Sequence, residues 1–174
     1  MIQNILFNKK PYKKIVMKIK PQADFNDLLA AVSMVTIEGR DIESDHILYA
    51  VLELLNNSLR AHREKKVEKS IHTEFSLDDN SLKICVQDWG GGFDPSSLPY
   101  NMETTPESID IHGKDFQKYR EENDYKRFGI GILVCKKTFS RFNLYFIDEE
   151  FNTVTWDTGR TAGTCVELSL GADT

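Results

Sequence analysis

Apolar and polar residues follow two different periods along the first part of the chain. Residues 13–21 alternate apolar and basic side chains, which predicts a strand with one face in water. Residues 23–39 instead carry apolar side chains at helical spacing, and Gly39 is the expected end of this helix. A longer helix is predicted over residues 41–66, with many charges toward its C-terminal end and Ser44 or Asp45 as its cap.

The second half of the chain predicts a hairpin, a long polar segment, and a helix followed by strands. Residues 72–77 and 82–88 flank the turn-forming sequence Asp-Asp-Asn-Ser at 78–81, which is typical of a β-hairpin. Residues 94–127 show little apolar periodicity, and such a long stretch inside a compact domain is usually functional or mobile. The glycine-rich residues 128–142 predict a turn that opens a helix. Three strands are expected after it, at residues 143–150, 153–158 and 163–170.

These elements predict an α+β fold in which helices cover a mixed sheet. The length of 174 residues suits a single domain, expected to span residues 1–174 with an N-terminal arm at residues 1–12. The composition, with 40% hydrophobic and 28% charged residues, is that of an ordinary globular protein.

The charge and the cysteines narrow the classes of function. A net charge of −5 argues against binding nucleic acid through bulk positive charge. The longest apolar run, near residues 130–135, is far shorter than the roughly 20 residues of a membrane helix, and the N-terminus does not resemble a secretory signal. The three cysteines are widely spaced and are expected to be buried thiols in a reducing compartment. We therefore expect a cytoplasmic protein without a membrane or nucleic-acid partner.

Four polar side chains share one face of the helix predicted over residues 41–66. At about 100° per residue, Asn57 lies roughly 40° and Arg60 roughly 20° from Glu53. Asn56 lies near the same stripe, whereas His62 falls on the opposite side. A carboxylate one turn before a carboxamide can orient or deprotonate a hydroxyl while the amide oxygen binds Mg²⁺. A helix with one wetted face is the simpler interpretation of this segment alone.

A second polar cluster, Asp88-Trp-Gly-Gly-Gly, directly follows a predicted strand. An aspartate at a strand end can accept a hydrogen bond from an amino group inside a pocket. The glycines, which include Gly90 and Gly92, allow the backbone to approach a ligand closely. An ordinary turn is the alternative, and Trp89 is expected to anchor the core.

A third cluster, residues 126–132, opens a predicted helix. Gly129 and Gly131 leave free N–H groups at the helix start, where the helix dipole favours phosphate, and Lys126 and Arg127 add positive charge just before it. The chain has no Walker A sequence and no Gly-x-Gly-x-x-Gly after a strand. Any nucleotide must therefore be bound in another way.

In their order and spacing, these clusters resemble the motifs of the Bergerat-fold ATPases, a superfamily that includes gyrase-type topoisomerases, sensor histidine kinases and anti-sigma-factor serine kinases. The resemblance covers about residues 42–170 and implies a two-layer α/β sandwich, with helices on one face of a mixed, mainly antiparallel sheet. The matching motifs are Glu53-x-x-x-Asn57 for the N box, Asp88-x-Gly90-x-Gly92 and Gly129-x-Gly131-Ile132 for the two glycine boxes, and Gly163-Thr164 for a late strand.

The resemblance implies a role for each matched residue. Asp88 would accept the amino group of adenine, supported by Thr164. Asn57 would coordinate Mg²⁺, and Glu53 would be the general base or polarising carboxylate. Residues 94–127 would form the ATP lid. The other positions implied to bind the nucleotide are Arg60, Gly90, Gly92, Lys126, Arg127, Gly129 and Gly131.

A strand and a helix before the N box resemble the arrangement in stand-alone anti-sigma-factor serine kinases. Those proteins transfer the γ-phosphoryl group of ATP to Ser or Thr of a small antagonist protein and also hold a sigma factor. The resemblance thus implies ATP and Mg²⁺ as ligands and a sigma factor or its antagonist as partner, with a homodimer left open. A histidine-kinase-type catalytic domain and a nucleotide-gated, non-catalytic interaction module are the alternatives, although His46 lacks the surroundings of a phospho-acceptor.

Overall fold

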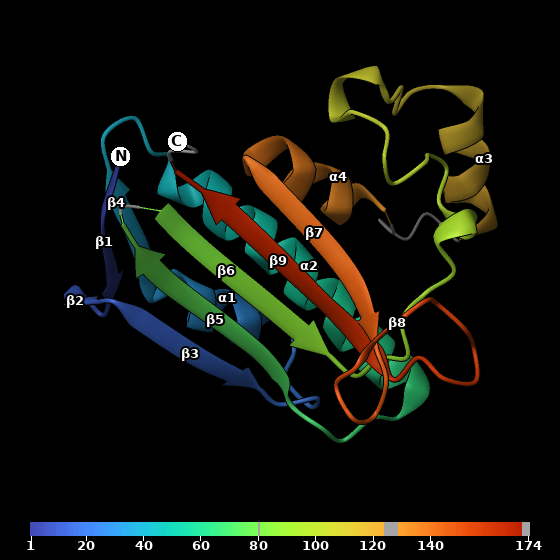
Figure 1. Cartoon of the computed structure of the whole chain (residues 1–174), viewed down its shortest axis with the longest axis horizontal. Coiled ribbons are helices and arrows are strands. Elements are labelled where there is room, and N and C mark those ends of the chain that lie inside the picture. The colour runs from blue at the N-terminus through green and yellow to red at the C-terminus, as the bar shows by residue number, and fades with distance from the viewer. Residues whose placement is uncertain (80, 124–128, 172–174) are drawn as a thin grey trace.

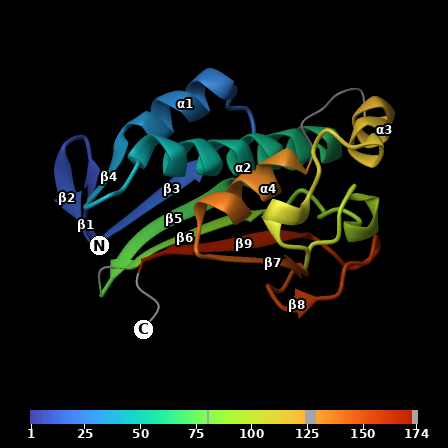
Figure 2. The ribbon, with the colours of Figure 1, turned by 90° about the horizontal axis from the view of Figure 1, so that it is seen from above.

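A layer of helices covers one face of a six-stranded sheet, and none of the helices that the structure describes lies on the opposite face (Figure 1, Figure 2). The computed structural model describes residues 1–79, 81–123 and 129–171. Every strand pair within these residues is antiparallel. The expected α+β fold, a two-layer arrangement with helices on one face of a mainly antiparallel sheet, is confirmed. Among the helices described, none has the length and apolar character needed to cross a bilayer.

Six strands form the main sheet in the order β3 (Lys14–Ile19), β5 (Ile71–Asp78), β6 (Ser81–Asp88), β9 (Gly163–Leu170), β7 (Arg141–Ile147) and β8 (Thr153–Val154). The hairpin predicted around residues 78–81 is confirmed as β5 and β6. The register of β6 and β9 places Asp88 directly opposite Thr164. The strand predicted at residues 153–158 was too long, because Asp157 forms a turn in which its carboxylate accepts the N–H of Gly159 at 2.7 Å.

The N-terminal residues form a second sheet of three strands, in the order β2 (Lys10–Tyr12), β1 (Ile2–Phe7) and β4 (Val35–Gly39). Residues 1–12, expected as an arm, supply β1 and β2, and the side chains of Ile2 and Ile5 are fully buried. This segment therefore contributes to the hydrophobic core.

The helix predicted over residues 23–39 is wrong in its second part. Helix α1 covers Phe25–Ser33 and begins with a capping box, in which Asp24 and Asp27 each accept the backbone N–H of the other at 2.9 Å. The chain then enters β4 through a Val-Thr-Ile run. Three β-branched residues favour a strand, and pairing with β1 outweighs their helical spacing.

The predicted long helix is α2 (Ser44–Lys65), the central helix of the layer. The prediction of its cap was wrong, because the N-cap is Glu43, and the Glu43 side chain makes no capping hydrogen bond. The Ser44 hydroxyl instead accepts the N–H of Ile37 at 3.0 Å. Ser44 thereby ties the start of α2 to β4.

The main hydrophobic core lies between α2 and the covered face of the sheet. Leu55 and Leu59 of α2 are almost completely buried, as are Phe75 of β5 and Ile84 of β6. Helix α4 (Ile130–Thr138) packs beside α2 and buries the free thiol of Cys135. Removing this apolar surface from water fixes α2 over the inner strands.

The expected lid contains only short helices where it is described. They are η1 (Pro95–Ser97), η2 (Pro106–Ser108) and α3 (Lys114–Glu122). Both views place α3 beyond the start of α4 and away from the sheet (Figure 1, Figure 2). The end of this segment, residues 124–127, lies outside the described residues.

Candidate functional site

A cavity of about 70 Å³ lies between α2, the ends of β6 and β9, and the start of α4. Its lining includes at least one residue from each of the four sequence motifs, namely Asn57, Asp88, Gly92, Gly129 and Thr164. Most of the remaining wall is apolar and is built by Leu54, Ala61, Val86, Ile132, Leu144 and Val166. The structure therefore brings motifs that are far apart in the sequence to one mainly apolar cavity.

The carboxylate of Asp88 is held by three hydrogen-bond donors from three parts of the chain. Ser58 of α2 donates to Oδ2 at 2.8 Å, and Thr164 of β9 donates to the same oxygen at 2.6 Å. The backbone N–H of Gly90 donates to Oδ1 at 2.8 Å. Asp88 is buried and lines the cavity, so its carboxylate presents acceptor oxygens in a fixed direction. The sequence motifs did not identify Ser58, whose position beside Asn57 was the available signal.

The glycines around Asp88 allow close packing that a side chain would prevent. A Cβ at Gly90 would lie 2.5 Å from the Cβ of Ala61, and one at Gly163 would lie 1.9 Å from the carbonyl oxygen of Asp88. Gly92 has φ of +66°, and a Cβ there would lie 2.8 Å from Thr161 Cγ2. These approaches set the width of the cavity at the end of β6.

Glu53 and Asn57 face α4, not bulk solvent. A Cβ at Gly131 would lie 2.8 Å from Asn57 Nδ2 and 3.4 Å from Glu53 Cβ, so Gly131 marks a close approach of α4 to α2. Glu53 is only 9% exposed, and it does not line the cavity. Arg60 donates from Nη2 to Asn57 Oδ1 at 3.2 Å. Glu53, Asn57 and Arg60 are thus buried or part-buried next to the cavity, whereas Asn56 is exposed, so the interpretation as a simple wetted face was wrong for these three residues.

The start of α4 is shaped by Gly129, which has φ of +83° and occupies the N-cap. The Tyr100 hydroxyl donates to the carbonyl oxygen of Gly129, and Lys136 donates to carbonyl oxygens of the lid segment at Met102 and Thr104. Two of the expected site residues, Lys126 and Arg127, lie outside the described residues.

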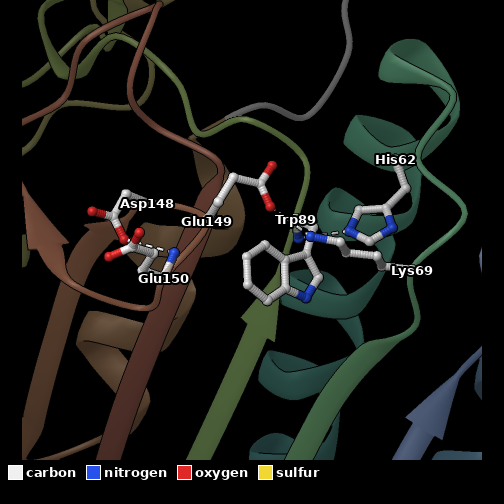
Figure 3. Close-up of polar contacts among 6 residues, drawn as sticks. All are labelled: His62, Lys69, Trp89, Asp148, Glu149 and Glu150. Atoms are coloured by element: carbon white, nitrogen blue, oxygen red, sulfur yellow. Dashed lines mark hydrogen bonds and ion pairs between the residues drawn. The ribbon is translucent and has the colours of Figure 1, made fainter.

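His62 fixes the backbone just after Asp88. Its Nε2 accepts the N–H of Trp89 at 2.8 Å, and the imidazole is fully buried (Figure 3). Burial lowers the pKa of His62. This effect is larger than the opposing effects of Asp88 and of the Lys69 backbone, which raise the pKa. The neutral imidazole is therefore the acceptor that joins α2 to the end of β6.

Trp89 packs outside the cavity, as expected for a core anchor. Its ring is in a buried cluster with Ile147 and Cys165. Lys69 places Nζ 4.0 Å from the ring centroid and also pairs with Glu149 at 2.6 Å (Figure 3). These contacts hold the turn after β6 against the loop between β7 and β8.

The geometry agrees with the comparison to known families. A family model for the histidine kinase-like ATPase domain matches residues 25–170. The chain belongs to this family of ATPase domains, which confirms the resemblance to the Bergerat-fold ATPases. A search of curated proteins found no match. An ATPase domain implies ATP as the ligand.

The buried His62 predicts acid-sensitive stability. The unfolded chain binds a proton near pH 6.5, whereas the folded state resists protonation, so stability is present above this pH and is lost below it. The free energy of unfolding should fall between pH 7 and pH 5 by up to about 1.4 kcal/mol per pH unit. Urea denaturation should show a smaller fall for His62→Gln and an unchanged fall for the exposed His112→Gln. Equal pH dependence in wild type and His62→Gln would contradict this role.

The close approach of Gly163 to Asp88 predicts a strong effect of one methyl group. Gly163→Ala should lower the free energy of unfolding by about 1–3 kcal/mol, because the added Cβ overlaps the β6 backbone. Gly159→Ala is the matched control, since a Cβ there meets only Asp157 Oδ1 at 3.3 Å, and it should change stability by less than about 0.5 kcal/mol. Chemical denaturation measures the free energy of unfolding of both variants. Similar values for Gly163→Ala and Gly159→Ala would contradict this prediction.

Proposed function

We propose that this protein binds ATP with Asp88 at the adenine and transfers the γ-phosphoryl group to Ser or Thr of a regulatory protein. The observation that supports this most is the single cavity lined by Asp88, Thr164, Asn57 and Gly129. Membership of the ATPase family supports the nucleotide, and the resemblance to anti-sigma-factor serine kinases supports the hydroxyl acceptor.

The cavity beside Asp88 suits a purine. The Asp88 carboxylate accepts a hydrogen bond from the exocyclic amino group of adenine, and apolar side chains such as Leu54 and Val166 contact the faces of the ring. Its volume of about 70 Å³ is too small for a complete nucleotide, which needs roughly 300 Å³ or more. The triphosphate therefore extends past Asn57 toward the start of α4.

The residues beside the cavity suit phosphates and Mg²⁺. The amide oxygen of Asn57 is a hard ligand for Mg²⁺, which when bound neutralises charge on the phosphates. In the structure this oxygen accepts a hydrogen bond from Arg60. Because the bound cation would replace that donor, Arg60 turns from Asn57 to the phosphates. Lys126 and Arg127 add positive charge, and the N–H groups near Gly129 and Gly131 face the same anion. The backbone at Gly90 and Gly92 completes the expected nucleotide contacts.

Glu53 carries the chemistry in this proposal. It is buried one turn before Asn57, where it orients or deprotonates the attacking hydroxyl. Positioning and charge neutralisation do most of the catalytic work in phosphoryl transfer. A sigma factor or its antagonist is the proposed partner, in a cytoplasmic protein that acts as a single domain over residues 1–174. Residues 94–127 are the proposed lid.

A nucleotide-gated interaction module without catalysis is the second candidate. Tyr100 and Lys136 connect the lid segment to α4, next to the cavity. A nucleotide that moves α4 would also move this segment, and the affinity for a partner would then change without any phosphoryl transfer.

Asp88 should make the protein selective for an exocyclic amino group. Isothermal titration in Mg²⁺ should show ATP binding at least about tenfold more tightly than ITP, which presents a carbonyl oxygen to the buried carboxylate. Asp88→Asn should lose this preference, and Asp78→Asn, at the exposed end of the hairpin, should keep it. Equal affinity of the wild type for ATP and ITP would exclude the proposed adenine contact.

Glu53 should matter for transfer and not for binding. Glu53→Gln should reduce transfer of labelled phosphate to co-purified partner proteins by about 100-fold or more, while the affinity for ATP changes by less than about threefold. Acid-stable label identifies phosphoserine or phosphothreonine, and acid-labile label would indicate a histidine acceptor. Undiminished transfer by Glu53→Gln would remove Glu53 from the reaction.

A further inference from the structure

Helix α3 carries a buried hydroxyl group, that of Tyr119. Tyr119 is 6% exposed, and its hydroxyl oxygen is shielded from solvent yet has no hydrogen-bond partner among the residues that the structure describes. A buried hydroxyl that forms no hydrogen bond destabilises the fold. The presence of this hydroxyl is explained if a bound ligand supplies the hydrogen-bond partner that it lacks among the described residues.

The ring of Tyr119 is held in place by an aromatic cluster. Phe116 packs edge-on against Tyr119 with ring centroids 6.3 Å apart, and Phe116 stacks on Tyr100 at 6.1 Å. The Tyr100 hydroxyl donates to the carbonyl oxygen of Gly129 at the start of α4. The cluster therefore attaches α3 to the turn proposed to face phosphate, and it fixes the ring while leaving the hydroxyl unpaired.

The surroundings of the hydroxyl favour an anionic partner. Burial raises the pKa of Tyr119 to about 12, and the positive charge of Arg60 opposes this increase, which places Arg60 within electrostatic range of the phenol. Tyr119 therefore remains a hydrogen-bond donor at neutral pH. Arg60 also donates to Asn57, which lines the cavity. The cluster that holds Tyr119 and the guanidinium of Arg60 thus each contact a residue that lines the cavity, namely Gly129 and Asn57.

We propose that the Tyr119 hydroxyl donates a hydrogen bond to a phosphate of the bound nucleotide, beside Arg60, so that α3 responds to the phosphate chain. This inference rests on the proposed ATP site and adds a phosphate-binding residue from the lid segment. A nucleoside without phosphate fills the purine cavity and leaves Tyr119 unpaired. The position of α3 therefore depends on the phosphates and not on the base.

Tyr119→Phe tests this contact because it removes only the hydroxyl. Titration calorimetry with Mg²⁺-ATP should show about 10- to 100-fold weaker binding, as expected for the loss of a hydrogen bond to a charged group. The affinity for adenosine should be unchanged. The melting temperature of the nucleotide-free variant should equal or exceed that of the wild type, since the lost hydroxyl had no partner. Tyr12→Phe, on the exposed strand β2, is the matched control and should alter none of these values.

Two further variants separate a phosphate contact from a general effect on the lid. Tyr100→Phe should lower the melting temperature of the nucleotide-free protein, because its hydroxyl bonds to Gly129. The effects of Tyr119→Phe and Arg60→Gln on ATP affinity should be non-additive, as expected for two groups that hold the same phosphate.

The possible results are distinguishable. Wild-type affinity of Tyr119→Phe for ATP would overturn this inference, while a preference of the same protein for ATP over ITP would leave the proposed function intact. Equal losses of affinity for ATP and adenosine in Tyr119→Phe would also overturn this inference. So would a clearly lower melting temperature of this variant without nucleotide, because the hydroxyl would then stabilise the fold itself. Failure of the wild type to bind ATP would remove the proposed function and this inference with it.

Discussion

The carboxylate of Asp88 is the point on which the site depends. A buried carboxylate needs hydrogen-bond donors, and these come from Ser58 on α2, Thr164 on β9 and the N–H of Gly90. The three donors join the helix layer to two central strands at one end of the sheet. The same contacts leave the carboxylate facing a cavity lined by apolar side chains. A single charged group thus orients the end of β6 and defines what the cavity can recognise.

Helix α2 connects this carboxylate to the rest of the site. One side of the helix packs into the core, and His62 accepts the backbone N–H next to Asp88. On the same helix, Glu53 faces α4, and Asn57, one turn later, lines the cavity. Gly131 allows α4 to approach α2 closely at this point. The start of α4 is in turn bonded to the lid segment through Tyr100. The proposed base and phosphate sites and the lid segment are therefore connected through α2 and the start of α4.

The sequence predicted which distant residues meet better than it predicted the element boundaries. The resemblance of three motifs to a known family selected Asn57, Asp88 and Thr164, and all three line one cavity. The helix expected to reach Gly39 ended early, since pairing with β1 depends on distant residues and outweighs local spacing. The Ser58 contact and the buried Tyr119 hydroxyl were not predicted for a related reason. Each depends on how a helix packs against other elements. The residues next to a serine or tyrosine in a helix do not indicate which tertiary contacts its hydroxyl makes.

In the proposed complex, one cavity holds the purine at Asp88 and directs the phosphates past Asn57. The decisive measurement is a crystal structure of the protein with Mg²⁺ and a non-hydrolysable ATP analogue. We expect the amino group of adenine within about 2.7–3.2 Å of the Asp88 carboxylate and the phosphate chain beside Asn57 and Arg60. An analogue bound elsewhere, with the cavity between α2, β6 and β9 still closed around Asp88, would contradict the account.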